Sequence, residues 1–249
     1  MQLNPQLIDA STIRPARIVV CEPEDPRILS AAYHAQQLGI AAMTLVGNPE
    51  KIRETAASLS LDICHLPIEN PTTSNKRGRL VQALHAKRAH KGMTLEAARQ
   101  FISDPLCFAN MLVATGEVEG SVAGAVYCTA DVVRSALQLI GKKKDTPIVS
   151  SFFLMLFHLA QHDEPIKAIF SDCGLVIEPT EVELAAIAIA AVDSAKMLLP
   201  VPPRVAMLSF STGRSADHPC VTKVVNAAQR VKAALPDLAI DEDIQFDAA

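Results

Sequence analysis

The residues from 124 to 134 combine side-chain types that suit the binding of an anion. Gly124 lets the backbone approach a ligand closely, Thr129 offers a hydroxyl, and Asp131 is placed to cap a following helix whose free N–H groups attract negative charge. Arg134 would then lie in the first turn of that helix, where its planar guanidinium matches two oxygens of a phosphate group. A solvated arginine at a helix start is the alternative interpretation, and the residues alone favour it.

A second group of cations surrounds Arg88. Lys87, His90 and Lys91 lie beside it and Gly92 follows, a pattern typical of a helix end whose dipole is complemented by positive charge. Charge clusters of this kind are common on protein surfaces. The pattern therefore leaves two interpretations open, a solvated helix end or an anion contact.

Hydroxyl side chains gather in the segment 209–215, which follows a predicted strand. Ser211 and Thr212 would line a crevice at the carboxyl edge of a sheet, where α/β proteins bind ligands. An ordinary turn built from turn-favouring residues is the alternative. Cys128 lies next to Thr129, but nothing in the sequence supplies its thiol with a base, so we expect it to be a packing group and not a nucleophile.

Composition limits the class of protein that positions these residues. The chain has 249 residues, of which 49% are hydrophobic, enough for one large core or two smaller ones. A formal net charge of -4 gives no electrostatic reason to expect a nucleic-acid partner. No GxGxxG motif follows a strand, which disfavours a nucleotide-binding dehydrogenase. Chemistry on small molecules is the better expectation.

Cysteine usage and hydropathy indicate a cytoplasmic protein that does not cross a membrane. The six cysteines are scattered without a CxxC pair, which disfavours a metal site and suits reduced thiols. The N-terminus lacks a basic segment followed by an apolar run, so no secretory signal is predicted. The most apolar stretch, 148–160, is too short to span a bilayer. We expect it to be a buried element.

Short β-branched runs alternate with alanine-rich helical patterns in the first part of the chain. A strand at 17–20 precedes a helix that Asp25 caps and Gly39 ends, and a strand at 42–46 precedes a helix at 50–58. Such alternation predicts a parallel sheet covered by helices.

The later part of the chain carries three further element signals. Thr180 and Glu183 form a predicted capping box for a helix that reaches Lys196. A strand is expected at 204–209 and a helix at 219–234, opened by a proline in its first turn.

Three segments also occur in an order that is characteristic of one enzyme family. They are Arg-Ala-His-Lys-Gly-Met-Thr at 88–94, Gly-Ala-Val-Tyr-Cys-Thr-Ala-Asp-Val-Val-Arg at 124–134 and Ile-Val-Ser-Ser-Phe-Phe-Leu-Met-Leu at 148–156. The chain resembles phosphate acetyltransferase and phosphate butyryltransferase in these segments. Weaker matches extend the resemblance over nearly the whole chain, at 17–20, 45–48, 172–173, 179–180 and 204–213.

The resemblance implies an α/β fold with parallel or mixed sheets flanked by helices. The family architecture has two domains and is similar to that of isocitrate and isopropylmalate dehydrogenases, which would place a first domain at 1–150 and a second at 151–249. Family members continue past the position of Ala249, so the second domain is expected to be incomplete here. The resemblance also implies a homodimer.

For function, the resemblance implies transfer of an acetyl or other short acyl group between coenzyme A and inorganic phosphate. Acetyl-CoA, phosphate and acetyl phosphate would be substrates, with no bound cofactor and no metal. Thr129 and Arg134 would bind the phosphoryl group, Arg88 would contact coenzyme A or phosphate, and Ser211 and Thr212 would contact a ligand. The family's base and oxyanion-stabilising serine fall beyond Ala249, so no catalytic residue is assigned.

The best-matching segment also departs from the family at four positions. Many members have Ser, His, Thr or Ser, and Pro where this chain has, in order, Ala123, Tyr127, Cys128 and Ser135. Fewer hydroxyls near a phosphate weaken its binding, since each hydrogen bond to a charged group is worth about 1.5 to 3 kcal/mol. A non-catalytic paralogue that binds coenzyme A or an acyl phosphate, or that serves as a subunit of an assembly, is therefore the alternative.

Overall fold

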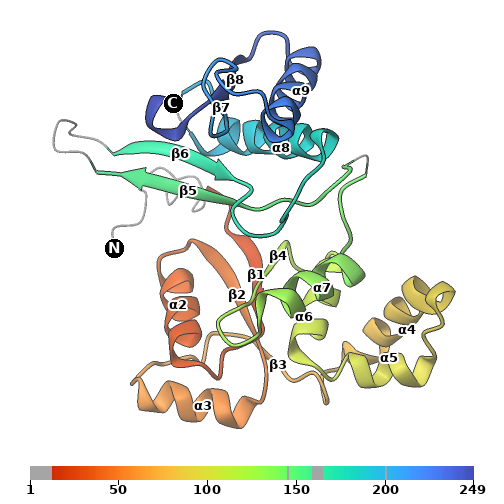
Figure 1. Cartoon of the computed structure of the whole chain (residues 1–249). Coiled ribbons are helices and arrows are strands. Elements are labelled where there is room, and N and C mark those ends of the chain that lie inside the picture. The colour runs from red at the N-terminus through yellow and green to blue at the C-terminus, as the bar shows by residue number, and fades with distance from the viewer. Residues whose placement is uncertain (1–12, 145, 159–164, 200) are drawn as a thin grey trace. The chain divides into compact units, whose positions relative to one another are not determined.

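The computed structural model of the chain describes residues 13–144, 146–158, 165–199 and 201–249 (Figure 1). These residues form two compact units, of which the first ends at Gly141 and the second begins at Lys142. The sequence placed a domain boundary nearby, after residue 150. Both units combine helices with short sheets, so the α/β class expected from the sequence is confirmed.

A four-stranded parallel sheet forms the centre of the first unit, in the order β3-β2-β1-β4. The strands are β1 (Ala16–Val20), β2 (Ala41–Val46), β3 (Ile68–Glu69) and β4 (Gly120–Val122). β1 pairs with β2 on one side, starting at Ala16 and Ala41, and with β4 on the other, starting at Ile18 and Gly120. β1 is therefore an inner strand, and the segment that follows it lies beside the segment that follows β4.

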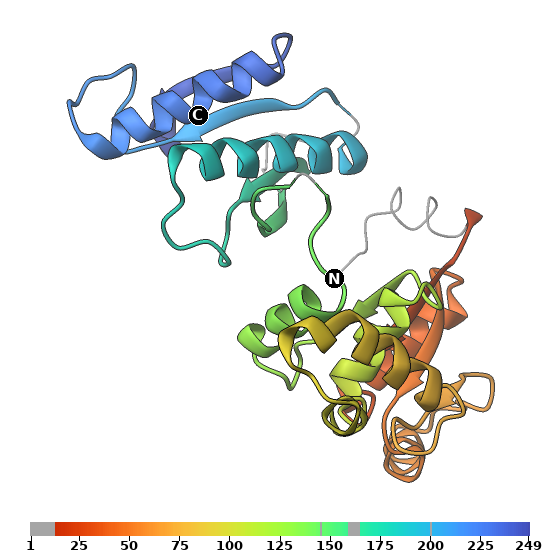
Figure 2. The same ribbon diagram turned by 90° about the vertical axis from the view of Figure 1, so that its right-hand side faces the viewer.

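Helices cover both faces of this sheet, as the views in Figure 1 and Figure 2 show. They are α2 (Pro26–Gln37), α3 (Pro49–Ser58), α4 (Arg77–Arg88), α5 (Leu95–Phe101), α6 (Pro105–Ala114) and α7 (Thr129–Leu139), with a 3-10 turn η1 (Ala89–Lys91) after α4. Successive residues of a strand point to opposite faces. Val20 accordingly packs among residues of α2 and α3, whereas Val19 packs among residues of α4, α5 and α6.

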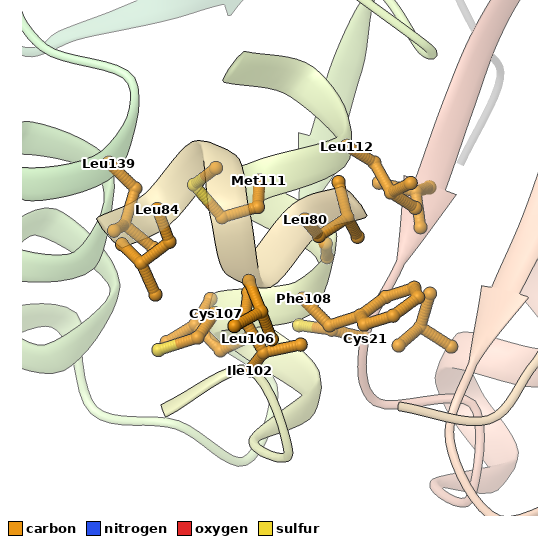
Figure 3. Close-up of a cluster of buried hydrophobic side chains, with 14 of the residues drawn as sticks. Cys21, Leu80, Leu84, Ile102, Leu106, Cys107, Phe108, Met111, Leu112 and Leu139 are labelled. Atoms are coloured by element: carbon orange, nitrogen blue, oxygen red, sulfur yellow. The ribbon is translucent and has the colours of Figure 1, made fainter. Parts of the chain in front are cut away.

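Figure 3 shows the cluster on the second of these faces. Phe108 of α6 is fully buried at its centre and lies beside Cys21, the residue that follows β1. Leu84 of α4 and Leu139 of α7 belong to the same cluster. The apolar packing thus holds α7 and the end of β1 against one common core.

Local signals set the ends of several helices as the sequence predicted. Asp25 caps α2 by accepting a hydrogen bond from the backbone N of Arg27 at 2.8 Å. Gly39 follows α2 with a φ of 67°, in the left-handed region that glycine adopts without strain. The helix after β2 begins at Pro49 behind the capping residue Asn48. These matches confirm the βαβ pattern read from the sequence.

In its described residues, the second unit contains two separate two-stranded sheets and two long helices. Its elements are β5 (Phe152–Phe157), β6 (Ile166–Ser171), α8 (Glu181–Leu198), β7 (Arg204–Leu208), α9 (Pro219–Ala234), β8 (Ala239–Ile244) and the 3-10 turn η2 (Phe246–Ala248). β5 and β6 are antiparallel, whereas β7 and β8 are parallel. A core of apolar side chains from α8, α9 and β7 joins the helices to the β7–β8 pair.

The predicted capping box at the start of α8 is confirmed. The backbone N of Glu183 donates to Oγ1 of Thr180 at 3.3 Å, and the backbone N of Thr180 donates to Oε2 of Glu183 at 2.9 Å. The helix expected at 219–234 is found with those bounds. Both matches reflect start signals that act within one turn of helix.

The expectation that 148–160 forms a buried element is wrong for the part that the structure describes, 148–158. Its strand β5 exposes 41% of Phe152 and 56% of Phe153. In the described part of the chain, β5 belongs to a two-stranded sheet with β6, and so small a sheet leaves much of the surface of its strands open. Among the described residues, no helix is long and apolar enough to cross a membrane.

Candidate functional site

The segment predicted to bind an anion follows β4 at the carboxyl edge of the parallel sheet. Because β1 and β4 are neighbours and run in the same direction, the residues after β1 and those after β4 meet at this edge. Glu22, two residues past β1, thereby reaches the segment 124–127. This edge is where ligands are bound in open α/β sheets.

The carboxylate of Glu22 accepts hydrogen bonds from four consecutive backbone N–H groups. Oε2 accepts from Gly124 at 2.9 Å and from Ala125 at 3.0 Å, and Oε1 accepts from Val126 at 2.8 Å and from Tyr127 at 2.6 Å. Glu22 is only 6% exposed. Burial alone would raise the pKa of Glu22, but the four N–H donors outweigh it and lower that pKa. The carboxylate is therefore ionised and fixes the course of the segment.

Two further contacts hold the same segment. Arg27 donates from Nη2 to the carbonyl oxygen of Ala125 at 3.2 Å. The hydroxyl of Tyr127 donates to Oδ2 of Asp104 at 2.9 Å, while Oδ1 of Asp104 caps α6 by accepting from the backbone N of Cys107. Burial and this bond to the Asp104 carboxylate raise the pKa of Tyr127. The segment before α7 is thus tied to β1, α2 and α6.

Helix α7 begins one turn earlier than the sequence suggested, so two expectations are corrected. Its capping residue is Cys128, and Asp131 lies within the first turn instead of capping the helix. Arg134 is the sixth helical residue and lies in the second turn. Cys128 makes no side-chain capping bond. In the described part of the chain, the backbone N–H groups of Thr129 and Ala130 have no internal acceptor and remain available to an anion.

Arg134 forms an ion pair on the surface of this helix. Its Nη1 lies 2.7 Å from Oδ1 of Asp131, and the two side chains are 62% and 52% exposed. Exposed pairs of this kind contribute only about 0.3 to 0.5 kcal/mol. An arriving phosphate can therefore replace Asp131 as the partner of Arg134 at small cost.

Cys128 is exposed, which corrects the expectation that it is a packing residue. Its Sγ donates a hydrogen bond to Oδ2 of Asp131 at 3.1 Å. Two other cysteines, Cys21 and Cys107, are buried in the core, and their pKa values are raised to about 12. Burial is the main cause for both thiols, followed by the charge of Glu22 for Cys21 and the charge of Asp104 for Cys107. None of these three thiols has the surroundings of an activated nucleophile.

Arg88 is the last residue of α4, at the helix end that the sequence predicted. The neighbouring Lys87 donates from Nζ to the carbonyl oxygen of Ile140, the residue that ends α7, at 3.1 Å. The end of α4 therefore lies beside the end of α7, whereas Thr129 starts that helix, roughly 16 Å away along its 11 residues. Arg88 therefore follows a residue that contacts the far end of α7 from Thr129.

The hydroxyl segment 209–215 in the second unit is organised by Asp243 of β8. Asp243 is 7% exposed and accepts hydrogen bonds from Oγ of Ser209, from Oγ of Ser211 at 2.8 Å and from the backbone N of Arg214 at 2.8 Å. Burial would raise the pKa of Asp243, but these donors lower it. Ser211 is completely buried, so its hydroxyl holds the loop and faces no solvent. Thr212 is exposed and bonds to Gln245.

A third carboxylate of the same kind follows β6. Asp172 accepts from the backbone N of Ser151 at 2.6 Å and from the backbone N groups of Gly174, Leu175 and Val176 at 2.8, 2.7 and 3.2 Å. Burial alone would raise the pKa of Asp172, yet these N–H groups outweigh it and hold that pKa well below its usual range. Asp172 thus joins the residues before β5 to those after β6.

The sequence assigned no role to Glu22, Asp172 or Asp243, which organise the loops at these strand ends. Glu22 and Asp172 lie just past a strand, and a carboxylate after a mainly apolar run is the signal that could have identified them. Asp243 lies within β8 after two other acidic residues, so this signal does not identify it. The structure keeps Thr129 with Arg134 on one helix and Ser211 with Thr212 in one loop. Among the described residues, no group of three or more His, Cys, Asp or Glu is arranged to hold a metal ion.

Comparison with known proteins decides the family. Residues 3–249 match the family model described as phosphate acetyl/butaryl transferase. The chain belongs to this family. It is 43% identical over 233 residues to the phosphate acetyltransferase of Clostridium acetobutylicum, a match that covers 94% of this chain and 70% of that protein. It is 39% identical over 249 residues to the phosphate acetyltransferase of Thermoanaerobacterium thermosaccharolyticum, covering all of this chain and 75% of that protein.

Solved structures of phosphate acetyltransferases share the fold. The phosphotransacetylase from Streptococcus pyogenes matches with a TM-score of 0.90 and 34% identity, over 98% of this chain and 73% of that one. The EutD phosphotransacetylase from Staphylococcus aureus matches with a TM-score of 0.86 and 35% identity, over 97% of this chain and 72% of that one. The resemblance read from the sequence motifs is thus confirmed.

Proposed function

We propose that this chain transfers an acetyl or other short acyl group between coenzyme A and inorganic phosphate. Membership of the phosphate acetyl/butaryl transferase family over residues 3–249 carries the proposal. In the direction from acetyl phosphate, the thiol sulfur of coenzyme A forms a bond to the acyl carbon, and the bond from that carbon to the phosphate oxygen breaks. Phosphate leaves with the electron pair, and the thiol proton passes to a base that we do not assign.

The start of α7 supports a place for the phosphoryl group. The unpaired N–H groups of Thr129 and Ala130 point out of the helix end, where the helix dipole favours an anion, and Thr129 adds a hydroxyl. Arg134 supplies a charge that now forms an exposed ion pair with Asp131. We propose that Thr129 and Arg134 hold the phosphate oxygens, because their donors need no rearrangement of the backbone.

The other expected contacts receive distinct roles in this proposal. We assign Arg88 to coenzyme A rather than to the phosphoryl group, because its neighbour Lys87 contacts the far end of α7. Of the two loop residues expected to contact a ligand, we assign Thr212 to direct ligand contact, since it is exposed whereas Ser211 is buried. Ser211 is buried against Asp243, so we propose that it positions the loop and does not touch the ligand.

We further propose a two-domain architecture similar to that of isocitrate and isopropylmalate dehydrogenases, with domains at 1–150 and 151–249. The existence of two compact units supports this proposal. The exposed phenylalanines of β5 favour association into a homodimer, because apolar surface on an outer strand invites pairing. A cytoplasmic location agrees with the scattered, unpaired cysteines. Light scattering of the purified protein would give its oligomeric state.

The test of acyl transfer is the release of phosphate from acetyl phosphate in the presence and absence of coenzyme A. The variant Arg134→Ala should lose roughly 10- to 150-fold in rate, the equivalent of one hydrogen bond to a charged group. Arg99→Ala is the matched control, because Arg99 is an equally exposed arginine in an i,i+3 ion pair with Glu96 on α5. It should retain the wild-type rate.

Two results would change the assignment. Equal loss in both arginine variants would mean that the effect is not specific to α7. Folded wild-type protein that binds acetyl phosphate or coenzyme A without turnover would favour the non-catalytic paralogue. Release that needs coenzyme A and is lost only in Arg134→Ala would support the transferase and the phosphate contact together.

A further inference from the structure

Glu22 is a buried carboxylate outside the set of residues expected to touch a substrate, yet it has the densest set of hydrogen bonds near α7. Each of its oxygens receives two backbone N–H groups from the segment 124–127, at 2.6 to 3.0 Å. Four consecutive N–H groups that converge on one point form a cradle that would otherwise suit an anion. Here the chain's own side chain fills that cradle.

The segment held in this way leads directly into α7. Tyr127, the last residue bonded to Glu22, is next to Cys128, the capping residue, and Thr129 follows as the first helical residue. Cys128 provides no side-chain cap, so the backbone before it has to set where the open N–H groups of the helix lie. Arg27 and Asp104 secure the flanks of the segment, but only Glu22 bonds to all four of its N–H groups.

We infer that Glu22 is a positioning residue for the phosphoryl group: it fixes the segment 124–127 so that Thr129 and Arg134 meet the phosphate. This inference rests on the proposed function. It also explains why Glu22 occupies the four N–H groups of the segment 124–127. Because these groups are already hydrogen-bonded, they cannot compete with the start of α7 for the phosphate.

The variant Glu22→Gln tests the inference with little change in shape. One carboxylate oxygen becomes an NH2 group, which faces two backbone N–H donors and cannot accept from them. We expect the dissociation constant for acetyl phosphate, measured by calorimetry without coenzyme A, to rise about tenfold. Hydrogen exchange at Gly124–Tyr127 should accelerate at least tenfold in the same variant.

Glu119→Gln is the matched control. Glu119 accepts from the backbone N of Arg17 at 2.7 Å and from its guanidinium, so it also joins the regions of β1 and β4, but at the opposite ends of these strands. This variant should leave both the dissociation constant and the exchange of 124–127 unchanged. A merely structural role for Glu22 would accelerate exchange without altering the affinity for acetyl phosphate.

If Glu22→Gln does not fold, two milder variants test whether Glu22 positions the phosphate site. Glu22→Asp keeps the charge but shortens the reach, and Tyr127→Phe removes the bond from the same segment to Asp104. Each should raise the dissociation constant about threefold. Because binding is measured without turnover, a wild-type protein that binds acetyl phosphate but transfers no acyl group would contradict the proposed function alone.

Three results would overturn the inference. Unchanged affinity in the Glu22 variants would show that the segment does not position the phosphate site. Tighter binding in Glu22→Gln would show that Glu22 competes with the ligand for the cradle. Absence of acetyl phosphate binding by the folded wild type would remove the site that Glu22 is inferred to position.

Discussion

Asp172→Asn should destabilise the second unit by about 2 to 4 kcal/mol. In the wild type, Oδ1 accepts from Gly174, Leu175 and Val176, and Oδ2 accepts from the backbone N of Ser151 at 2.6 Å. The asparagine keeps one acceptor and turns the other into a donor. At least one charge-assisted hydrogen bond, worth about 1.5 to 3 kcal/mol, is lost, and an unsatisfied N–H group adds about 1 kcal/mol or more.

The pH dependence of this loss follows from the lowered pKa of Asp172. The unfolded chain takes up the proton first, near the ordinary aspartate value of about 3.9. The stability that the carboxylate contributes is therefore complete above about pH 5 and declines as the pH falls toward the folded-state pKa. Asparagine takes up no proton, so the difference in stability between wild type and variant should narrow between about pH 5 and pH 2.

Hydrogen exchange of peptides from 165–199, followed as urea is raised, measures the free energy of unfolding of this unit. Asp241→Asn serves as the control, because Asp241 is an exposed carboxylate of the same unit. With an m-value of about 2 kcal/mol per molar urea, the expected loss moves the midpoint by roughly 1 to 2 M. Equal behaviour of the two variants, or a difference that does not shrink in acid, would refute the role assigned to the Asp172 hydrogen bonds.

Two other predictions concern the first unit. Phe108→Ala should destabilise the first unit by about 3 to 5 kcal/mol, because removal of the fully buried ring leaves a cavity in the core shown in Figure 3. Urea unfolding measures this loss of stability. A loss below about 1 kcal/mol would contradict the packing described for Phe108. Cys21 and Cys107, whose pKa values are raised to about 12, should resist a thiol reagent until the protein unfolds. Mass spectrometry of the labelled native protein should find modification first at the exposed cysteines, which are Cys64, Cys128 and Cys220.

The sequence was sufficient wherever a structure is set by residues close together in the chain. Asp25 with Pro26 began α2, and Thr180 with Glu183 began α8, because a helix start needs only partners within one turn. The motif at 124–134 and its companions also placed the chain in its family. Where a proline and a capping side chain did not mark the start, at α7, the predicted boundary failed and Asp131 was given the wrong role.

Tertiary structure decided which groups the site residues actually face. Nothing local to Glu22 indicates that it will accept four N–H groups from a segment about 100 residues away, since that depends on β1 and β4 pairing in parallel. The same holds for Ser211, a hydroxyl that the sequence placed at a ligand and that Asp243 holds in the interior. The sequence thus determined the family, the residue types and the local elements. Strand order and burial determined which polar groups are free to bind a ligand. Strand order and burial arise only when distant segments of the chain pack together, so the sequence pattern did not reveal them.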